Sequence, residues 1–202
     1  LCTDDSSIWN YRETGGPNIN IGEDTARIPS LKGKTMVWNQ LVNNGNFAST
    51  VDWISEDTEY TTFSVSNNEV HAVTTDGSYG IYQNKPFFIG GHKYLLRGDL
   101  KVSNSAHAVT VRFNGESVNQ SINSLTYTHL SYVYELNTSR QLVMITGMTS
   151  GSFEWWAKNV QVIDLTKMFG AGYEPTAEQF EKLFPNSYYP YCEGRLVNLG
   201  IA

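Results

Sequence analysis

The sequence predicts an all-β domain, a two-sheet antiparallel β-sandwich with one short C-terminal helix packed on it. Three observations lead to this fold class. Short segments alternate apolar and polar residues, turn signals such as Asp76-Gly77, Gly90-Gly91 and Asn114-Gly115 separate them, and a single segment carries convincing helix start and stop signals. Short strands at regular spacing, joined by such turns, are typical of β-sandwiches.

The alternation assigns the strands. We predict strands over 60–65, 68–74, 78–83, 93–102, 106–114, 126–136, 140–148 and 152–164, in a domain that opens at 36–42. The pattern is clearest in 93–102 and 106–114, where side chains two apart share a face. It places Leu96, Leu100, Val109 and Val111 in the core, and it turns Arg97, Asp99 and Lys101 away from the core.

The predicted helix covers 176–184. Thr176 is the N-cap, and Gln179 completes a Thr-x-x-Gln capping box. Phe180 and Leu183 lie on its apolar face. Because a helix of this length is unstable alone, we expect it to dock on the sandwich. The tyrosines that follow, at 188, 189 and 191, are expected to lie alongside it.

These elements divide the chain into an N-terminal arm (1–34), the sandwich (35–166) and a C-terminal helical clasp with a tail (167–202). The chain opens on Leu1 rather than Met, so we expect it to be an excised fragment of a longer protein. Cys2 and Cys192 lie at opposite ends. A disulfide between them would close nearly the whole chain, and two unpaired thiols are the alternative, because two cysteines cannot establish a disulfide framework.

Composition narrows the function classes. The formal net charge of −6 and the pI near 5.2 argue against a nucleic-acid partner, which requires a basic surface. No run approaches the roughly 18 apolar residues of a membrane span. Charged residues make up 17% of the chain and aromatic residues 13%. We expect an extracellular protein or one carried on a particle such as a virion.

Several motifs resemble a known family. Asn43-Asn44-Gly45-Asn46-Phe47 leads to Trp53, Tyr79-Gly80-Ile81-Tyr82-Gln83 precedes the segment Gly91 to Gly98, and the last predicted strand closes on Phe153 to Leu165. This order is similar to that of the jelly-roll carbohydrate-binding modules attached to bacterial xylanases and other glycanases. The resemblance covers about 36–166, and it implies a jelly-roll sandwich with a glycan as ligand.

A second resemblance concerns the C-terminal segment. The stretch from Ile163 to Tyr191, which includes Met168-Phe169-Gly170-Ala171-Gly172, looks like one found in tail and fibre proteins of phages and prophages of gut bacteria, together with an opening like that from Val37 to Phe47. This resemblance implies a place in a virion, with fibre proteins as partners and homo-oligomeric assembly. The clasp tyrosines are then structural.

The family resemblance also raises the question of calcium. Many jelly-roll carbohydrate-binding modules hold a structural calcium through an acidic residue just after the opening Phe and another in the closing strand. Here Ala48 follows Phe47, and Lys158-Asn159 occupies the corresponding place in the last strand. Asp52 is the one weak calcium candidate, so we expect no cofactor.

Catalytic patterns are weak. Glu116, Glu135, Glu154 and Asp99 form no recognisable pair of the kind that glycoside hydrolysis needs, and we expect them to be solvated. The four histidines lack the close spacing of a zinc site, and a Gly-x-Ser-x-Gly elbow is absent. We therefore expect a non-catalytic protein.

Aromatic residues are the best candidates for a binding site, because a sugar ring stacks its C–H face on Trp or Tyr. Trp155 and Trp156 are adjacent on a strand, so one belongs to the core and the other points outward. The candidate ligand-binding set is Trp155, Trp156, Tyr79, Tyr82, Arg112, Gln120 and His129.

Two functions of different class follow. The first is a carbohydrate-binding, adhesin-like module that recognises bacterial surface glycans. The second is a purely structural virion domain without a ligand of its own. An accessory domain of a glycan-active enzyme is a distant third.

Overall fold

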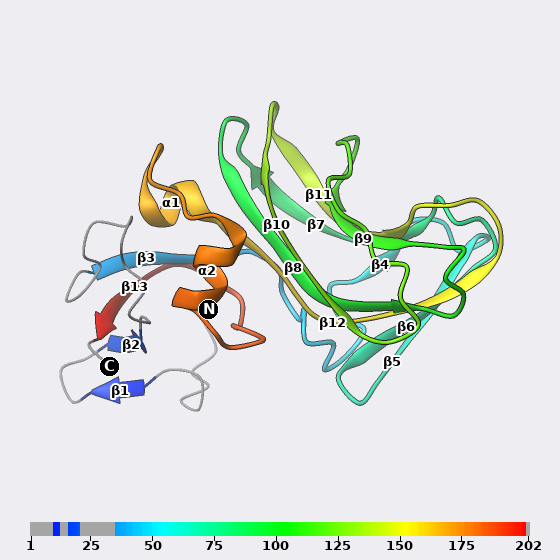
Figure 1. Ribbon diagram of the computed structural model, residues 1–202, viewed down its shortest axis with the longest axis horizontal. Coiled ribbons are helices and arrows are strands. Elements are labelled where there is room, and N and C mark those ends of the chain that lie inside the picture. Colours follow the sequence, from blue (N-terminus) through cyan, green and yellow to red (C-terminus); the bar gives the residue numbers. More distant parts are fainter. Residues whose placement is uncertain (1–9, 13–15, 21–34, 201–202) are drawn as a thin grey trace.

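The computed structural model describes residues 10–12, 16–20 and 35–200, and it shows a two-layer antiparallel β-sandwich (Figure 1). The predicted all-β fold class is confirmed. Five antiparallel strands form the sandwich part of the larger sheet, in the order β10, β8, β12, β6, β5. They are β10 (Thr128–Glu135), β8 (Lys93–Val102), β12 (Phe153–Asp164), β6 (Glu69–Thr74) and β5 (Thr61–Ser66).

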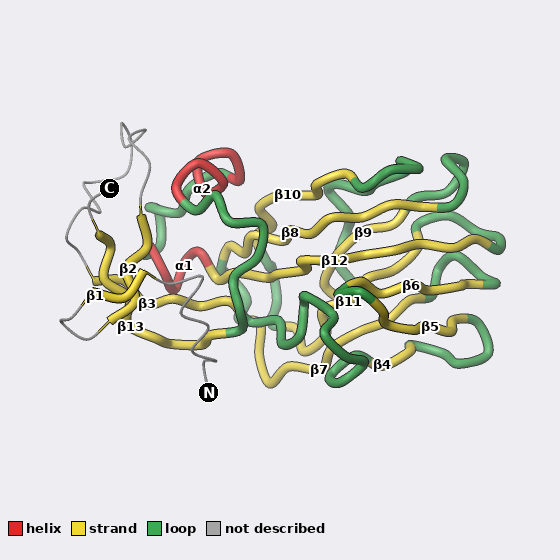
Figure 2. Tube along the Cα trace, turned by 90° about the horizontal axis from the view of Figure 1, so that it is seen from below, coloured by secondary structure: helices red, strands yellow, loops and turns green. Residues whose placement is uncertain are grey.

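Four antiparallel strands form the second sheet, in the order β4, β7, β11, β9. They are β4 (Ile54–Ser55), β7 (Gly80–Phe88), β11 (Arg140–Gly147) and β9 (Val109–Phe113). Figure 2 shows the larger sheet face-on. The predicted strands between 60 and 164 match this set to within five residues, the largest difference being at the end of β7, which continues from the predicted 83 to Phe88. The short β4 was not predicted, because alternation cannot reveal a strand of two residues.

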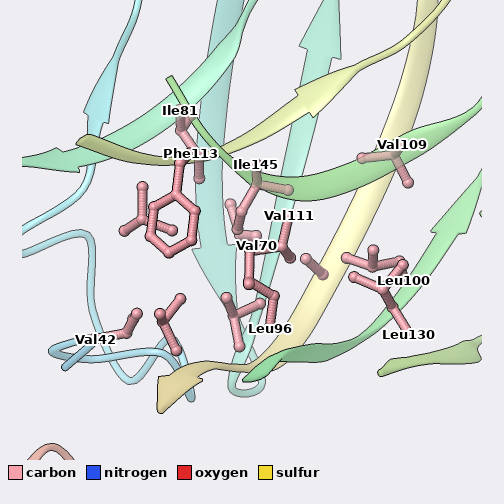
Figure 3. Packing of buried hydrophobic residues seen from close by; sticks show 14 of the residues in the cluster. Val42, Val70, Ile81, Leu96, Leu100, Val109, Val111, Phe113, Leu130 and Ile145 are labelled. Carbon is pink, nitrogen blue, oxygen red and sulfur yellow. The ribbon is translucent and has the colours of Figure 1, made fainter. Parts of the chain in front are cut away.

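Between the sheets lies the main core. Leu96, Leu100, Val109 and Val111 are each fully buried, as the alternation predicts, and they meet in one cluster from the two sheets (Figure 3). Phe113 packs edge-on against Phe88 with ring centroids 4.7 Å apart.

A β-bulge lets β12 keep its core contacts along its whole length. Asn159 has a left-handed φ of 56°, and the register with β8 shifts between Lys158 and Gln161. Trp155 faces the core before the bulge, and Val160 faces it afterwards. The Asn159 side chain donates a hydrogen bond to Asp99 Oδ2 at 2.8 Å.

The larger sheet continues beyond the sandwich. β3 (Thr35–Gln40) pairs with the last strand, β13 (Cys192–Gly200), and touches β12 through one residue pair. β2 (Gly16–Asn20) runs parallel to β13, and β1 (Asn10–Arg12) pairs with β2. The opening strand, expected in the sandwich, therefore pairs mainly with a C-terminal strand that the alternation missed. The domain boundaries themselves remain a prediction.

One of the two cysteines belongs to this extension. Cys192 is buried and disulfide-bonded. Cys2 is the only other cysteine of the sequence, and it lies outside the described residues.

The C-terminal clasp covers the outer face of the larger sheet near β10 and β8. It contains α1 (Leu165–Phe169) and α2 (Ala177–Leu183), and α2 has the predicted capping box between Thr176 and Gln179. A second core lies beneath it, separate from the first. Its members include Trp38, Leu95, Ile163, Phe180, Leu183, Phe184 and Tyr189. The predicted docking of the helix is confirmed.

Polar residues fix the glycine-rich turn of the clasp. Asp164 caps α1 by accepting a hydrogen bond from the Lys167 N–H, and its carboxylate lies 2.9 Å from His92 Nδ1. Glu174 accepts from the Thr166 hydroxyl at 2.8 Å and from the Gly172 N–H at 2.9 Å. Asp164 and Glu174 thus hold α1 and the glycine-rich turn in place, and Asp164 also contacts His92 in the turn before β8.

Candidate functional site

The structure divides the predicted ligand-binding set between three places. Trp155 is fully buried in the sandwich core, so it has no exposed face on which a sugar could stack. Trp156 points to the opposite side of β12, as expected for an adjacent strand residue, and is half-buried. Trp156 and His129 lie on the outer face of the larger sheet, whereas Tyr82 and Arg112 lie on the outer face of the four-stranded sheet.

On the larger sheet, both faces of the Trp156 indole are covered. The His71 ring of β6 stacks on it at a centroid distance of 4.6 Å and an interplanar angle of 5°. Lys101 of β8 places its Nζ 4.6 Å from the indole centroid. Because β6 and β8 flank β12 on opposite sides, the two neighbours occupy opposite faces of the ring. Only its edge is left for a ligand.

Tyr127, which sequence reasoning missed, occupies the adjoining part of this face. Lys101 and Lys158 each place Nζ over its ring, at 4.6 and 4.2 Å from the centroid. Its hydroxyl donates to Glu69 Oε2 at 2.6 Å. Tyr127 lies within the predicted strand 126–136, and in the structure it immediately precedes β10. Its position in that strand gives no sign of the two lysines that cover its ring. The aromatic surface of the larger sheet is therefore engaged by the protein itself.

His129 connects this sheet to α2. Its Nδ1 lies 2.9 Å from Asp99 Oδ1 and its Nε2 lies 3.2 Å from Glu181 Oε1. Arg97 pairs with the other Glu181 oxygen at 3.2 Å, and the Ser131 hydroxyl donates to Glu181 at 2.7 Å. The hydrogen bonds to Asp99 and Glu181 raise the pKa of His129 to about 9, so the imidazole is charged at neutral pH. His129 is thus part of a clasp–sheet ion-pair network.

The ionisation of His129 in this network predicts that the stability of the protein depends on pH. Because the pKa of His129 rises from 6.5 to about 9 on folding, its charged form stabilises the fold. That contribution is complete below pH 6.5 and is lost as the pH rises through about 9. We expect His129→Gln to lower the free energy of unfolding at pH about 6 and to leave it nearly unchanged at pH about 10.

Denaturant unfolding of both proteins across this range checks the prediction. If the difference in free energy of unfolding between the original protein and His129→Gln grows from pH about 6 to about 10, the prediction is wrong. On the acid side, burial raises the pKa of Asp99 and Glu181, but hydrogen bonds and nearby positive charges, those of His129 foremost, together outweigh burial and lower both pKa values. The charged forms of Asp99 and Glu181 therefore stabilise the fold above their ordinary pKa values of 3.8 and 4.5. This stabilisation is lost as the pH falls through their lowered pKa values in the folded protein.

The outer face of the four-stranded sheet has a different character. The strand register places one residue from each strand in a single row, because Ile54 is opposite Tyr82, Tyr82 opposite Met144, and Met144 opposite Arg112. Ile54 is 49% exposed, whereas Met144 between its neighbours is buried. We call this row, which contains Ile54, Tyr82, Met144 and Arg112, the four-strand row.

The two candidate side chains of the four-strand row, Tyr82 and Arg112, have no hydrogen-bond, ion-pair or ring partner in the described part of the chain. Glu56 interacts electrostatically with Arg112, without forming an ion pair with it. Arg112 Nε is buried without a hydrogen-bond partner, while the terminal nitrogens of the guanidinium keep solvent contact. Both side chains are half-buried.

The remaining candidates lie at the border of this face. Gln120 is exposed, and its backbone carbonyl accepts a hydrogen bond from the Thr110 hydroxyl at 2.6 Å. Thr110 and Arg112 are two apart on β9, so the Gln120 loop lies beside the same face. Tyr79 precedes β7 and stacks on Tyr60 with ring centroids 4.6 Å apart. Three of the predicted residues, Tyr82, Arg112 and Gln120, are therefore on one face.

The carboxylates are mostly paired with other groups. Glu116, expected to be solvated, is buried instead, because it pairs with Arg140 and accepts from the Tyr134 hydroxyl at 2.7 Å. Glu154 lies 2.7 Å from His71 Nε2. Glu135 is exposed, as expected.

Metal ligation has little support among the described residues. They contain no group of three or more His, Cys, Asp or Glu side chains that could hold an ion. Asp52, the weak calcium candidate, lies in an exposed turn and belongs to no such group among these residues. In the same part of the chain, no helix is long and apolar enough to span a membrane.

The comparisons with known proteins find structural likeness alone. No family model matches the chain, and no curated protein matches it significantly. A structure of the CBM22-1 and GH10 modules of a Clostridium thermocellum endo-1,4-β-D-xylanase, complexed with xylohexaose, is 16% identical over 62% of this chain and 28% of that one, with a TM-score of 0.46. A family 29 carbohydrate-binding module is 14% identical over 64% of this chain and 89% of its own, also with a TM-score of 0.46.

A third structure, the N-terminal cellulose-binding domain of a Cellulomonas fimi β-1,4-glucanase, is 12% identical over 59% of this chain and 92% of its own, with a TM-score of 0.44. Each of these TM-scores lies below 0.5. The likeness therefore supports no conclusion about what this chain binds, and a function has to be argued from its own residues.

Proposed function

We propose that this chain is a non-catalytic glycan-binding module of a phage tail or fibre protein, and that it recognises bacterial surface glycans through the outer face of its four-stranded sheet. One observation carries the choice of face. The side chains of Tyr82 and Arg112 lie in one row without a hydrogen-bond, ion-pair or ring partner among the described residues, whereas the rings of Trp156 and Tyr127 on the other sheet are covered by His71 and two lysines.

The chemistry of this row suits a sugar. The face of a tyrosine ring stacks on the C–H groups of a pyranose, and a guanidinium donates to hydroxyl or carboxyl oxygens. Tyr82 and Arg112 are two strands apart, which corresponds to roughly 10 Å across the sheet. That span accommodates neighbouring sugar units of a chain lying across the strands.

The tail or fibre setting is supported by the resemblance of the segment from Ile163 to Tyr191 to phage tail sequences. Stacking on one tyrosine gives weak binding, about millimolar to micromolar. Several copies on one particle would raise the avidity without new contacts. We therefore expect homo-oligomeric assembly on a virion or at another extracellular site.

Replacement of Tyr82 by Ala tests the proposal. A multimerised form of the chain should bind members of an array of bacterial polysaccharides, and Tyr82→Ala should reduce that binding about tenfold or more, because stacking on an aromatic ring contributes on the order of 1 kcal/mol or more per contact. The matched control is Tyr173→Ala, which removes a 63% exposed tyrosine in the clasp turn. It should leave binding unchanged.

Two results would contradict the proposal. Turnover of a glycan by the folded chain would overturn its non-catalytic part. If the multimerised chain binds neither the array nor a bacterial surface, the structural virion domain replaces the binding module as the proposed function.

A further inference from the structure

Arg112 differs from every other described cationic side chain. Five cations pair with a carboxylate, and two more lie over aromatic rings. The pairs are Lys93–Glu174, Arg97–Glu181, Arg140–Glu116, Lys167–Glu193 and Lys182–Glu178, and the stacked cations are Lys101 and Lys158. Of the Lys and Arg side chains that the structure describes, Arg112 alone has neither kind of partner.

The surroundings of Arg112 hold its charge in place without neutralising it. Its Nε is buried, so the stem is fixed by packing, and the terminal nitrogens reach solvent. Glu56 is close enough to interact with this charge but does not form an ion pair with it. Burial raises the pKa of Glu56, and the Arg112 charge offsets part of that rise. A preorganised guanidinium of this kind loses little freedom when it binds a ligand.

We propose that the glycan bound on this face carries a carboxylate, as uronic and sialic acids do, and that Arg112 binds this carboxylate through its terminal nitrogens. This inference rests on the proposed function and names the class of glycan. Hydrogen bonds between a guanidinium and a carboxylate are shorter and roughly twice as strong as those between neutral groups, and the planar fork of arginine matches both oxygens.

The overall charge of the chain strengthens the argument for a dedicated contact. With a formal net charge of −6, the protein as a whole repels an acidic polysaccharide. Binding of such a ligand therefore depends on a local cation that the protein does not already pair. Arg112 is that cation, on the face that also carries Tyr82.

The experiment compares acidic glycans with their neutral counterparts. The multimerised full chain is presented with polygalacturonate, alginate, sialyllactose and acidic bacterial polysaccharides, each beside its carboxyl-reduced form, and with phosphorylated glycans. We expect at least one carboxylated member to bind about tenfold more tightly than its reduced form. Arg112→Gln should abolish this preference, and Arg112→Lys, which keeps the charge but not the fork, should retain part of it.

Controls separate this inference from the proposed function. Lys182→Gln removes the same charge from an exposed site on α2 and should leave the preference intact. If neutral glycans bind as well as acidic ones and Tyr82→Ala abolishes that binding, the proposed function stands and the carboxylate inference is wrong. Preference for phosphorylated over carboxylated glycans would also overturn it. If no glycan binds, the proposed function itself fails.

Discussion

Phe180→Ala should lower the free energy of unfolding by about 3–5 kcal/mol, the usual effect of deleting a fully buried aromatic ring. Phe180 has no exposed surface, and its ring centroid lies 4.6 Å from that of Phe184 and 6.3 Å from that of Trp38. These rings join α2 to β3 and form the centre of the second core. The alanine would leave a cavity that a seven-residue helix cannot close without moving.

Chemical denaturation with a fluorescence readout measures this loss, and Lys182→Ala on the exposed side of the same helix is the control. That side chain is 52% exposed, so its loss should change stability by less than about 0.5 kcal/mol. We expect a single unfolding transition, because Leu95 packs in the second core while the adjacent Leu96 packs in the first. If Phe180→Ala leaves stability unchanged, the clasp is not part of the cooperative fold.

Local sequence patterns predicted the parts of the fold that depend on local physics. Alternation in 93–102 identified the buried Leu96 and Leu100 because the strand period fixes which side chains share a face. Thr176 and Gln179 identified the start of α2 because a capping box satisfies backbone donors within four residues. Both features need no knowledge of the rest of the chain.

Long-range pairing could not be predicted in this way. β3 pairs with β13, whose residues lie about 150 positions later, and no local pattern indicates that partnership. Arg97 has the alternation of a solvent-facing residue, and it does point away from the sandwich core. It is nevertheless 1% exposed, because the clasp covers it. Alternation fixes the face of a strand but not what covers that face.

The same limit explains why the predicted ligand-binding residues do not form one site. Each residue of the predicted ligand-binding set was chosen for its chemistry and its position on a strand. Which strands share a sheet was unknown, so Trp156 and His129 were grouped with Tyr82 and Arg112, although the two pairs lie on different sheets. Tyr127 lies within the predicted strand 126–136, but its contacts with Lys101 and Lys158 depend on tertiary structure, so no local pattern identifies it as part of a surface cluster.

The second large effect is expected at the ion pair beneath the clasp. Glu181→Ala should destabilise the protein by about 3–5 kcal/mol, because it leaves a buried guanidinium without its carboxylate. Arg97 Nη2 donates to the Asn186 carbonyl at 3.0 Å, but Nε and Nη1 have no hydrogen-bond partner. Burial lowers the pKa of Arg97, and Glu181 offsets part of this effect. Glu181 is therefore the carboxylate that contributes most to compensating for the burial of this charge.

Denaturant unfolding of Glu181→Ala, with Glu178→Ala as the control on the same helix, measures the effect. Glu178 pairs with Lys182 at the surface with a side chain 80% exposed, so its removal should have little effect. The double replacement Arg97→Met with Glu181→Leu should recover much of the lost stability, because apolar residues of similar size often replace a buried ion pair without loss. A Glu181→Ala effect below about 1 kcal/mol would show that apolar packing alone holds the clasp. The expected recovery would instead show that the ion pair specifies where α2 docks more than it stabilises the docked state.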